Sequence, residues 1–275
     1  MRGEFKSVLK IVRSYMLFGF FWIFLSGEIL HLITEDMSEY IILERYKSYF
    51  YIILTSFLLF KMIRNSYFRM KKTNRKFQQD LVQSFITALE FHDKYTKGHS
   101  EAVASYSIEI GEALGLKGKE LDDLYWAATM HDIGKIIVPI EILNKEEKLT
   151  DAEYKIIKNH SKIGYEIVSK NDSLKKVSKY ILHHHERWDG MGYPAGLKGD
   201  QIPLLSQIIS VADSWHAMTS KRSYKAQLTR EEAIEELVRN KGKQFSSEVI
   251  HAFIDLYNSK EDAFMFEKNY NFSIS

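Results

Sequence analysis

Residues 121–134 read LDDLYWAATMHDIG, and this stretch decides the fold. Four apolar residues in it recur at the spacing of one helix face: Leu121, Leu124, Tyr125 and Ala128. His131 and Asp132 continue that face, because they lie three and four residues beyond Ala128. Gly134 then offers a residue at which the helix can end or bend. The stretch predicts an amphipathic helix that carries a histidine and an aspartate inward.

The same test of helical faces selects inward polar residues elsewhere in the chain. His160 falls between Ile156 and Ile163, at four and three residues. Of the three adjacent histidines at 183–185, the second and third lie on the apolar face and the first lies opposite. The inward set comprises His99, His131, Asp132, His160, His184, His185 and Asp213. These residues lie on five successive predicted helices.

A buried set of this composition favours metal binding. A single inward histidine is more often a core residue bonded to a backbone carbonyl, but five histidines and two aspartates would all lose hydration unless something satisfied them together. Imidazole and carboxylate suit iron, manganese and similar ions. Seven ligands exceed what one octahedral ion with a bound water accepts, so they predict two ions that share a bridging group. A structural zinc site is the weaker alternative, because the chain has no cysteine.

Composition supports a helical chain that is mostly soluble. Its 275 residues suit one domain of catalytic size with an appendage. The 38 Lys and Arg residues nearly balance the 36 Asp and Glu residues, so the charge does not favour nucleic-acid binding. The absence of cysteine excludes disulfides and a cysteine nucleophile. Only three prolines, with 45% hydrophobic residues, favour an all-α fold over a turn-rich sandwich.

Two apolar stretches near the N-terminus, residues 15–33 and 49–63, predict a hairpin of two membrane spans. Basic residues precede the first stretch and follow the second, whereas the connection between them is acidic. By the positive-inside rule, both ends of the hairpin then lie in the cytoplasm. The sequence therefore predicts a multi-pass protein of the cytoplasmic membrane. A buried helical pair and a cleaved signal peptide are the alternatives.

Four motifs carry a resemblance to a known family. HDIGKI at 131–136 resembles the signature of the HD superfamily of metal-dependent phosphohydrolases, and HHERWDGMGYP at 184–194 resembles the motif of its HD-GYP branch. VAD at 211–213 and KRSYK at 221–225 extend the match, which runs from Leu81 to Leu256. HD-GYP proteins are bacterial phosphodiesterases that hydrolyse cyclic di-GMP at a bimetallic, often iron-containing, centre. The resemblance implies an HD-type helical bundle with its catalytic domain in the cytoplasm.

Four parts follow from these observations. Residues 1–63 are expected to form the membrane anchor with its two transmembrane helices, and 64–80 a basic juxtamembrane linker that could also touch anionic lipid. Residues 81–258 are expected to form the HD-GYP phosphohydrolase domain. The remainder, 259–275, is a C-terminal tail without a clear period.

The resemblance also assigns roles to residues at matching positions. It makes the seven inward residues metal ligands, with Asp132 bridging two divalent ions, iron or manganese. Some family members hold a third metal with a glutamate at the position of Tyr95, so two ions are expected here. Asp132 and Lys135 are the implied catalytic residues, because Lys135 matches a lysine near the scissile phosphate. The implied substrate-binding residues are Tyr193, Arg222 and Lys225.

Two positions depart from the family pattern and leave some substrate or supporting contacts open. His216 stands three residues after Asp213, where the family usually has aspartate, and Ser223 replaces the proline of an RPY motif. Three roles for His216 are considered: a further metal ligand, a partner of Asp213, and core packing. His92 is expected to be structural.

The resulting hypothesis is a metal-dependent phosphodiesterase that hydrolyses cyclic di-GMP to pGpG, GMP or both in bacterial signalling. A hydroxide held between two metals would attack the phosphodiester, and Lys135 would stabilise the developing charge. An HD enzyme for another cyclic dinucleotide and a catalytically weak cyclic di-GMP-binding module are the alternatives. Besides cyclic di-GMP and the membrane, the candidate partners are a second copy of the chain and a diguanylate cyclase with a GGDEF domain.

Overall fold

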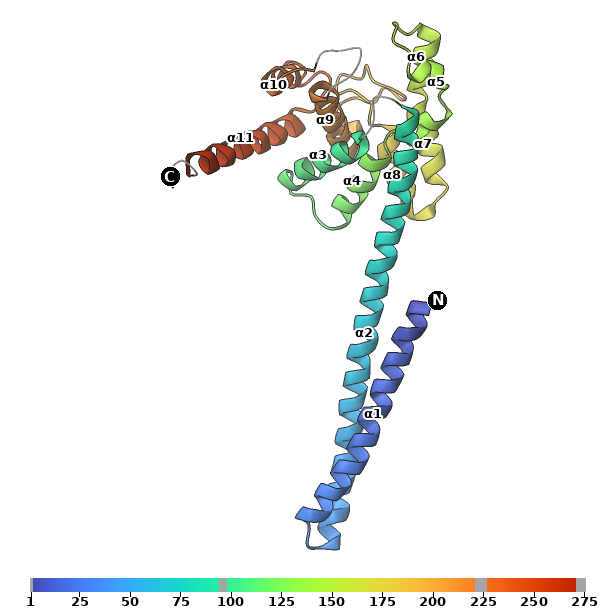
Figure 1. Cartoon of the computed structure of the whole chain (residues 1–275). Coiled ribbons are helices and arrows are strands. Elements are labelled where there is room, and N and C mark those ends of the chain that lie inside the picture. Colours follow the sequence, from blue (N-terminus) through green and yellow to red (C-terminus); the bar gives the residue numbers. More distant parts are fainter. Residues whose placement is uncertain (1, 94–97, 221–226, 271–275) are drawn as a thin grey trace. The chain divides into compact units, whose positions relative to one another are not determined.

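The computed structural model describes residues 2–93, 98–220 and 227–270. Within these ranges the chain forms helices and an isolated bridge between Lys241 and Phe245, and no strand (Figure 1). The predicted all-α fold is therefore confirmed for the described residues. The chain divides into two compact units, Met1–Leu81 and Val82–Ser275.

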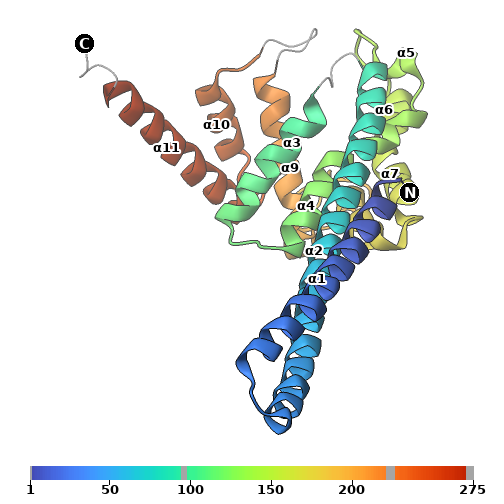
Figure 2. The same cartoon turned by 60° about the horizontal axis from the view of Figure 1, so that its bottom comes forward.

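The first unit contains α1 (Arg2–Ile33) and most of α2 (Met37–His92). Aromatic side chains join the two helices: the ring centroid of Trp22 lies 5.7 Å from that of Phe50 and 6.0 Å from that of Tyr51. Because only a short turn separates the helices, α1 runs antiparallel to the first part of α2, as Figures 1 and 2 show. The predicted linker, residues 64–80, lies inside α2 without a break.

The predicted hairpin of two transmembrane helices is wrong in its second span. Among the described helices, α1 alone is long and apolar enough to cross a membrane, over Leu9–Ile33 with a mean hydropathy of 1.8. In α2 the apolar stretch is bounded by Lys47 and Lys61, which leaves it shorter than the 20 residues or so that a span needs. The structure therefore supports one apolar N-terminal helix and not a multi-pass anchor.

The second unit contains the remaining helices and the hydrophobic core. In chain order they are α3 (His99–Ala113), α4 (Lys119–Met130), η1 (Ile133–Ile137), α5 (Ile140–Leu143), α6 (Asp151–Lys158), α7 (His160–Ser169), η2 (Asp172–Leu174), α8 (Lys175–Leu182), η3 (Gly199–Gln201), α9 (Leu204–Thr219), α10 (Arg230–Arg239) and α11 (Ser247–Tyr270). Helix α3 packs against α4 and α9, and α8 packs against α4 and α7 (Figures 1 and 2). Leu124, Ile181 and Ile208 are fully buried where these helices meet.

Local signals in the sequence explain how individual helices begin. Thr150 caps α6 by accepting from the backbone N–H of Glu153, whose carboxylate accepts from the backbone N–H of Thr150. This is the reciprocal arrangement that a Thr-x-x-Glu spacing predicts. Pro203 directly precedes α9, where a missing N–H costs no helical hydrogen bond. Residues 259–270 of the predicted tail continue α11.

Candidate metal centre

The HD motif lies at the end of α4, where the helix gives way to the 3₁₀ turn η1. His131 follows the last helical residue and its Nδ1–H donates to the carbonyl of Ala128 at 2.7 Å. A neutral imidazole then carries no proton on Nε2. That nitrogen is buried and has no hydrogen-bond partner among the described residues. A buried lone pair without a donor is what a metal ion would satisfy.

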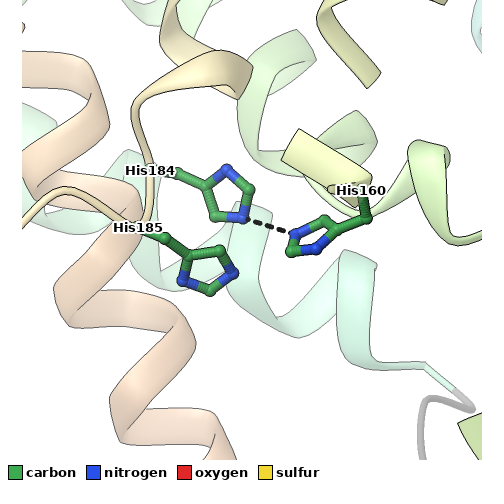
Figure 3. Close-up of side chains that lie close together, drawn as sticks. All are labelled: His160, His184 and His185. Atoms are coloured by element: carbon green, nitrogen blue, oxygen red, sulfur yellow. Dashed lines mark hydrogen bonds between the residues drawn. The ribbon is translucent and has the colours of Figure 1, made fainter. Parts of the chain in front are cut away.

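Two further histidines repeat this arrangement on neighbouring elements. His160 donates from Nδ1 to the carbonyl of Ile157 at 2.7 Å, and His184 donates from Nδ1 to that of Ile181 at 2.6 Å. Their Nε2 atoms lie 3.3 Å apart, the contact that is dashed in Figure 3. Since each neutral ring keeps its proton on Nδ1, neither Nε2 has a proton for the other. The pair therefore needs a cation or an added proton between the rings.

His185 completes this group of three. Its ring lies 4.0 Å from that of His184 and 5.0 Å from that of His160, centroid to centroid. Figure 3 shows the three side chains converging, His160 from α7 and the other two from the segment after α8. One ligand atom from each lies within 4.8 Å of the others, so the group could hold a metal ion.

Asp132 joins the first group to a second one. Its Oδ1 lies 3.5 Å from Nε2 of His160, and its Oδ2 lies 3.4 Å from Nε2 of His131 and 3.7 Å from Nε2 of His99. His99, His131 and Asp132 form the second group that could hold an ion. A carboxylate that faces both groups with different oxygens is placed to bridge two ions. The donor set of imidazole and carboxylate fits a binuclear site.

Asp213 and His216 reach the same centre from α9. Oδ1 of Asp213 lies 3.3 Å from Nε2 of His99. Burial by itself would raise the pKa of Asp213, but the hydrogen bond and charge of His99 hold it below its usual range. Nδ1 of His216 lies 2.8 Å from Nδ1 of His99, so His216 has a histidine as a partner at the centre. The sequence had not suggested this pairing.

The charge states of the centre suit metal ligands. Burial alone would raise the pKa of Asp132, but the Lys135 ammonium, followed by the surrounding imidazoles, holds that pKa well below its usual range. Burial lowers the pKa of His184 far below its ordinary value and that of His185 to about 3. Ionised carboxylates and neutral imidazoles are the protonation states in which these groups bind metals.

Lys135 lies one turn after the HD pair and faces two carboxylates. Its Nζ is 2.7 Å from Oδ2 of Asp132 and 3.7 Å from Oδ2 of Asp93. Sequence reasoning missed Asp93, although it lies four residues after Leu89 and so continues an apolar face. Both carboxylates raise the pKa of Lys135, against the effect of burial, so the lysine is held charged.

A backbone contact sets the distance between the HD turn and α7. A Cβ added at Gly134 would lie 2.0 Å from the carbonyl oxygen of His160 and 2.6 Å from the backbone nitrogen of Gly164. Only glycine permits this approach. Gly134 therefore determines how closely the HD turn, with His131 and Asp132, approaches α7, with His160.

Residues 189–199, called the GYP loop here, cover one side of the candidate metal centre. Glu186, which is buried, accepts from the backbone N–H groups of Ala195 and Leu197 at 2.7 and 3.0 Å. The backbone N–H of Tyr193 donates to the carbonyl of His185, and the two rings lie 4.9 Å apart. Sequence reasoning missed Glu186, and its position directly after the candidate ligands His184 and His185 was the available signal. The loop is thus tied to the residues that carry the candidate ligands.

A cleft of about 670 Å³ opens beside this loop. Its lining residues are Ile137, Ala152, Lys155, Ile156, Lys158, Asn159, Lys162, Tyr193 and Pro194. Burial, followed by Tyr154 and then by Asp132 and Asp213, raises the pKa of Tyr193, so its hydroxyl stays protonated. Nζ of Lys158 lies 5.1 Å from the centre of the Tyr193 ring. Three lysines in one cleft suit an anionic ligand.

Three residues singled out by the sequence lie outside the described residues: Tyr95, Arg222 and Lys225. Ser223 lies there as well, and the side chain of His92 is not described. The roles implied for Arg222 and Lys225 stay predictions.

Comparison with known proteins places the chain in a family. A family model described as HD domain matches residues 58–249. The chain belongs to the HD domain family. It is 39% identical over 228 residues to a cyclic di-GMP phosphodiesterase of Thermotoga maritima, covering 77% of this chain and 62% of that protein. It is 36% identical over 183 residues to 3'3'-cGAMP-specific phosphodiesterase 2 of Vibrio cholerae, covering 66% of this chain and 35% of the relative.

These similarities confirm the predicted resemblance to the HD-GYP family and the predicted HD fold. The chain spans less than two thirds of the length of both relatives. A crystal structure of a cyclic GMP-AMP-specific phosphodiesterase of V. cholerae matches the present chain with a TM-score of 0.50 at 22% identity. The match covers 65% of this chain and 48% of the other, and it supports the helical fold.

Proposed function

We propose that this HD domain protein is a metal-dependent phosphodiesterase that hydrolyses cyclic di-GMP to pGpG, GMP or both. The observation that carries the proposal is that Asp132 lies between a group of three histidines and the group that it forms with His99 and His131, beside a lysine and a loop that lines a cationic cleft. The identity to a cyclic di-GMP phosphodiesterase supports the choice of substrate.

The proposed ligands of two divalent ions are His99, His131, Asp132, His160, His184, His185 and Asp213. Iron or manganese suits this mixture of nitrogen and oxygen donors. When bound, the ions would supply a hydroxide at neutral pH and charge neutralisation at the phosphoryl oxygens. Hydrolysis breaks one ester P–O bond of the cyclic substrate, adds the hydroxyl group of water to phosphorus and leaves the proton on the departing sugar oxygen.

The remaining roles fall to residues around this centre. With Asp132 engaged by metal, the Lys135 ammonium would be available to a nonbridging oxygen of the scissile phosphate, where negative charge develops. The protonated Tyr193 hydroxyl is a hydrogen-bond donor to substrate on the cleft side. Arg222 can form a fork of hydrogen bonds with the second phosphate, and Lys225 adds a further positive charge.

The test is turnover of cyclic di-GMP by the full-length chain, purified in detergent without oxygen and loaded with Fe(II) or Mn(II). Asp132→Ala should abolish turnover, because it removes the bridging carboxylate. Asp172→Ala removes an exposed aspartate of the same unit and should leave turnover unchanged. A wild-type protein that holds both ions and releases no linear product would refute the proposal.

A second substrate is tested in the same assay. The 36% identity to a 3'3'-cGAMP-specific enzyme is close to the 39% identity to the cyclic di-GMP enzyme. The two cyclic dinucleotides differ in one base, so kcat/KM for each, measured in competition, decides the specificity. Tight binding of cyclic di-GMP without product would favour a binding module.

We further propose that α1 attaches the chain to the bacterial cytoplasmic membrane, with the HD domain in the cytoplasm. The apolar segment Leu9–Ile33 supports the attachment. The chain has no cysteine, so a single Ser173→Cys change provides a unique label in the HD domain. Labelling of intact cells by an impermeant maleimide would contradict the cytoplasmic location. A homodimer and a GGDEF partner stay predictions.

A further inference from the structure

Three buried histidines of the centre share one way of exposing Nε2. His131, His160 and His184 each donate from Nδ1 to the carbonyl three residues earlier, at 2.6 to 2.7 Å. In each case a helical turn before the histidine supplies that carbonyl. This fixes both the orientation of the ring and the nitrogen that carries the proton.

Nδ1 of His99 has a different partner among the described residues. His99 is the first residue of α3, and Gly98 before it has a left-handed φ of 73°. Nδ1 of His99 instead lies 2.8 Å from Nδ1 of His216, which belongs to α9.

The position of His99 decides which way this hydrogen bond runs. Nε2 of His99 faces Asp213 at 3.3 Å and Asp132 at 3.7 Å, and is thus the ligand atom of the second group. A ligating nitrogen carries no proton, so with metal bound a neutral His99 would hold its proton on Nδ1. Nδ1–H then donates to Nδ1 of His216, and the proton of a neutral His216 lies on its Nε2.

The main chain of His99 is held from a different helix. Glu90 of α2 accepts from the backbone N–H of Gly98 at 2.8 Å and from that of Ser100 at 3.0 Å. These two residues flank His99 on both sides. The start of α3 has no side-chain cap of its own, so this carboxylate takes the place of one.

We propose that His216 is a positioning residue of the metal centre, which accepts the Nδ1–H of His99 when metal is bound and so leaves Nε2 of His99 without a proton for the ion that it would share with the two aspartates. Glu90 holds the backbone of the same ligand. The inference rests on the metal site of the proposed function and not on its substrate. It predicts that His216 affects the metal held by His99, His131 and Asp132 more than the one held by the three other histidines.

The first test is Mn(II) titration of the metal-free, full-length protein by calorimetry, with the paramagnetic resonance spectrum recorded at saturation. His216→Leu removes the acceptor and should weaken one of the two binding steps by about 10- to 100-fold. His216→Asn presents an amide oxygen near the place of Nδ1 and should restore most of that loss. His251→Leu, at an exposed histidine of α11, is the control and should leave both steps unchanged.

A second pair of variants tests the backbone contact. Glu90→Gln replaces one accepting oxygen by an NH₂ group, which cannot accept, and should weaken the same binding step. Glu101→Gln makes the same chemical change at an exposed carboxylate in the first turn of α3 and should have no such effect.

Three results would overturn the proposal. The first is equal weakening of both steps by His216→Leu, which would indicate general destabilisation. The second is unchanged binding in that variant. The third is the absence of a proton from Nδ1 of His99 in the wild type loaded with diamagnetic Zn(II), read from imidazole nitrogen NMR shifts, which needs no variant to fold. Metal binding without turnover would refute the proposed phosphodiesterase and leave this inference standing.

Discussion

The substitution Gly134→Ala tests whether one backbone contact sets the spacing of the metal centre. The new methyl carbon would lie 2.0 Å from the carbonyl oxygen of His160, where ordinary contact begins at 3.4 Å. The HD turn and α7 must therefore separate by about 1.4 Å, the difference between these distances. No side-chain rotation relieves this contact, because the atoms it meets are backbone.

Two magnitudes follow from that displacement. Forcing a methyl group into a packed interface costs about 1–3 kcal/mol, and a rigid backbone neighbour places this site near 3 kcal/mol. For a unit of this size, thermal unfolding should occur about 6–12 °C lower. A misplacement of about 1 Å at a reacting centre lowers turnover by roughly 100-fold. The spread between the two ligand groups should also reduce metal content.

Gly164→Ala provides the matched control at the same interface. Its methyl carbon would lie 3.0 Å from Cγ2 of Ile181, a side-chain atom, and 3.6 Å from the backbone nitrogen of Gly134. A slight side-chain shift accommodates the first contact, and alanine favours the helix. The assay combines metal analysis, thermal unfolding of the metal-free protein and turnover. Wild-type metal content and Tm in Gly134→Ala, or equal losses in both variants, would refute the reasoning.

Three further predictions concern the loop, a helix start and pH. Glu186→Gln weakens two backbone hydrogen bonds of the GYP loop, so KM for cyclic di-GMP should rise about 10-fold at unchanged metal content, since charged hydrogen bonds contribute about 1.5–3 kcal/mol each; an unchanged KM in steady-state kinetics would contradict this. Thr150→Ala removes the cap of α6 and should cost about 1 kcal/mol, lowering Tm by about 2–4 °C without loss of turnover; a calorimetric scan that matches the wild type would count against the cap. For pH, burial lowers the pKa of His184, and that of His185 from 6.5 to about 3, so the unfolded chain binds more protons between these values. The metal-free protein should then lose stability as pH falls below about 6.5 and regain it as pH rises, which urea unfolding at several pH values measures; a flat profile from pH 7 to pH 4 would contradict the neutral, buried imidazoles.

Where the sequence predicted well, the deciding interactions are local. The face on which His131 and Asp132 lie follows from helical periodicity within a dozen or so residues, and the cap at Thr150 depends on a residue three positions away. The family motifs are equally short. The set of seven inward residues, which the structure brings together, could therefore be found before any packing was known.

The predictions that failed depended on the length of an apolar stretch or on contacts with another element or loop. The second apolar stretch appeared to form a span, yet Lys47 and Lys61 leave too little between them to cross a membrane. Asp93 and Glu186 were missed because their partners belong to other elements or to a loop whose shape the sequence does not reveal.

The sequence by itself determined the all-α class, the inward faces and the donor chemistry of the centre, because each depends on residue type and on spacing along one helix. Only the tertiary structure decided that Asp132 faces two ligand groups, that Gly134 lies against the backbone of His160, and that the partner of His99 is His216. His99 and His216 are 117 residues apart in the chain. Contacts of that kind depend on how α3 and α9 pack, and helical periodicity carries no information about which helices become neighbours.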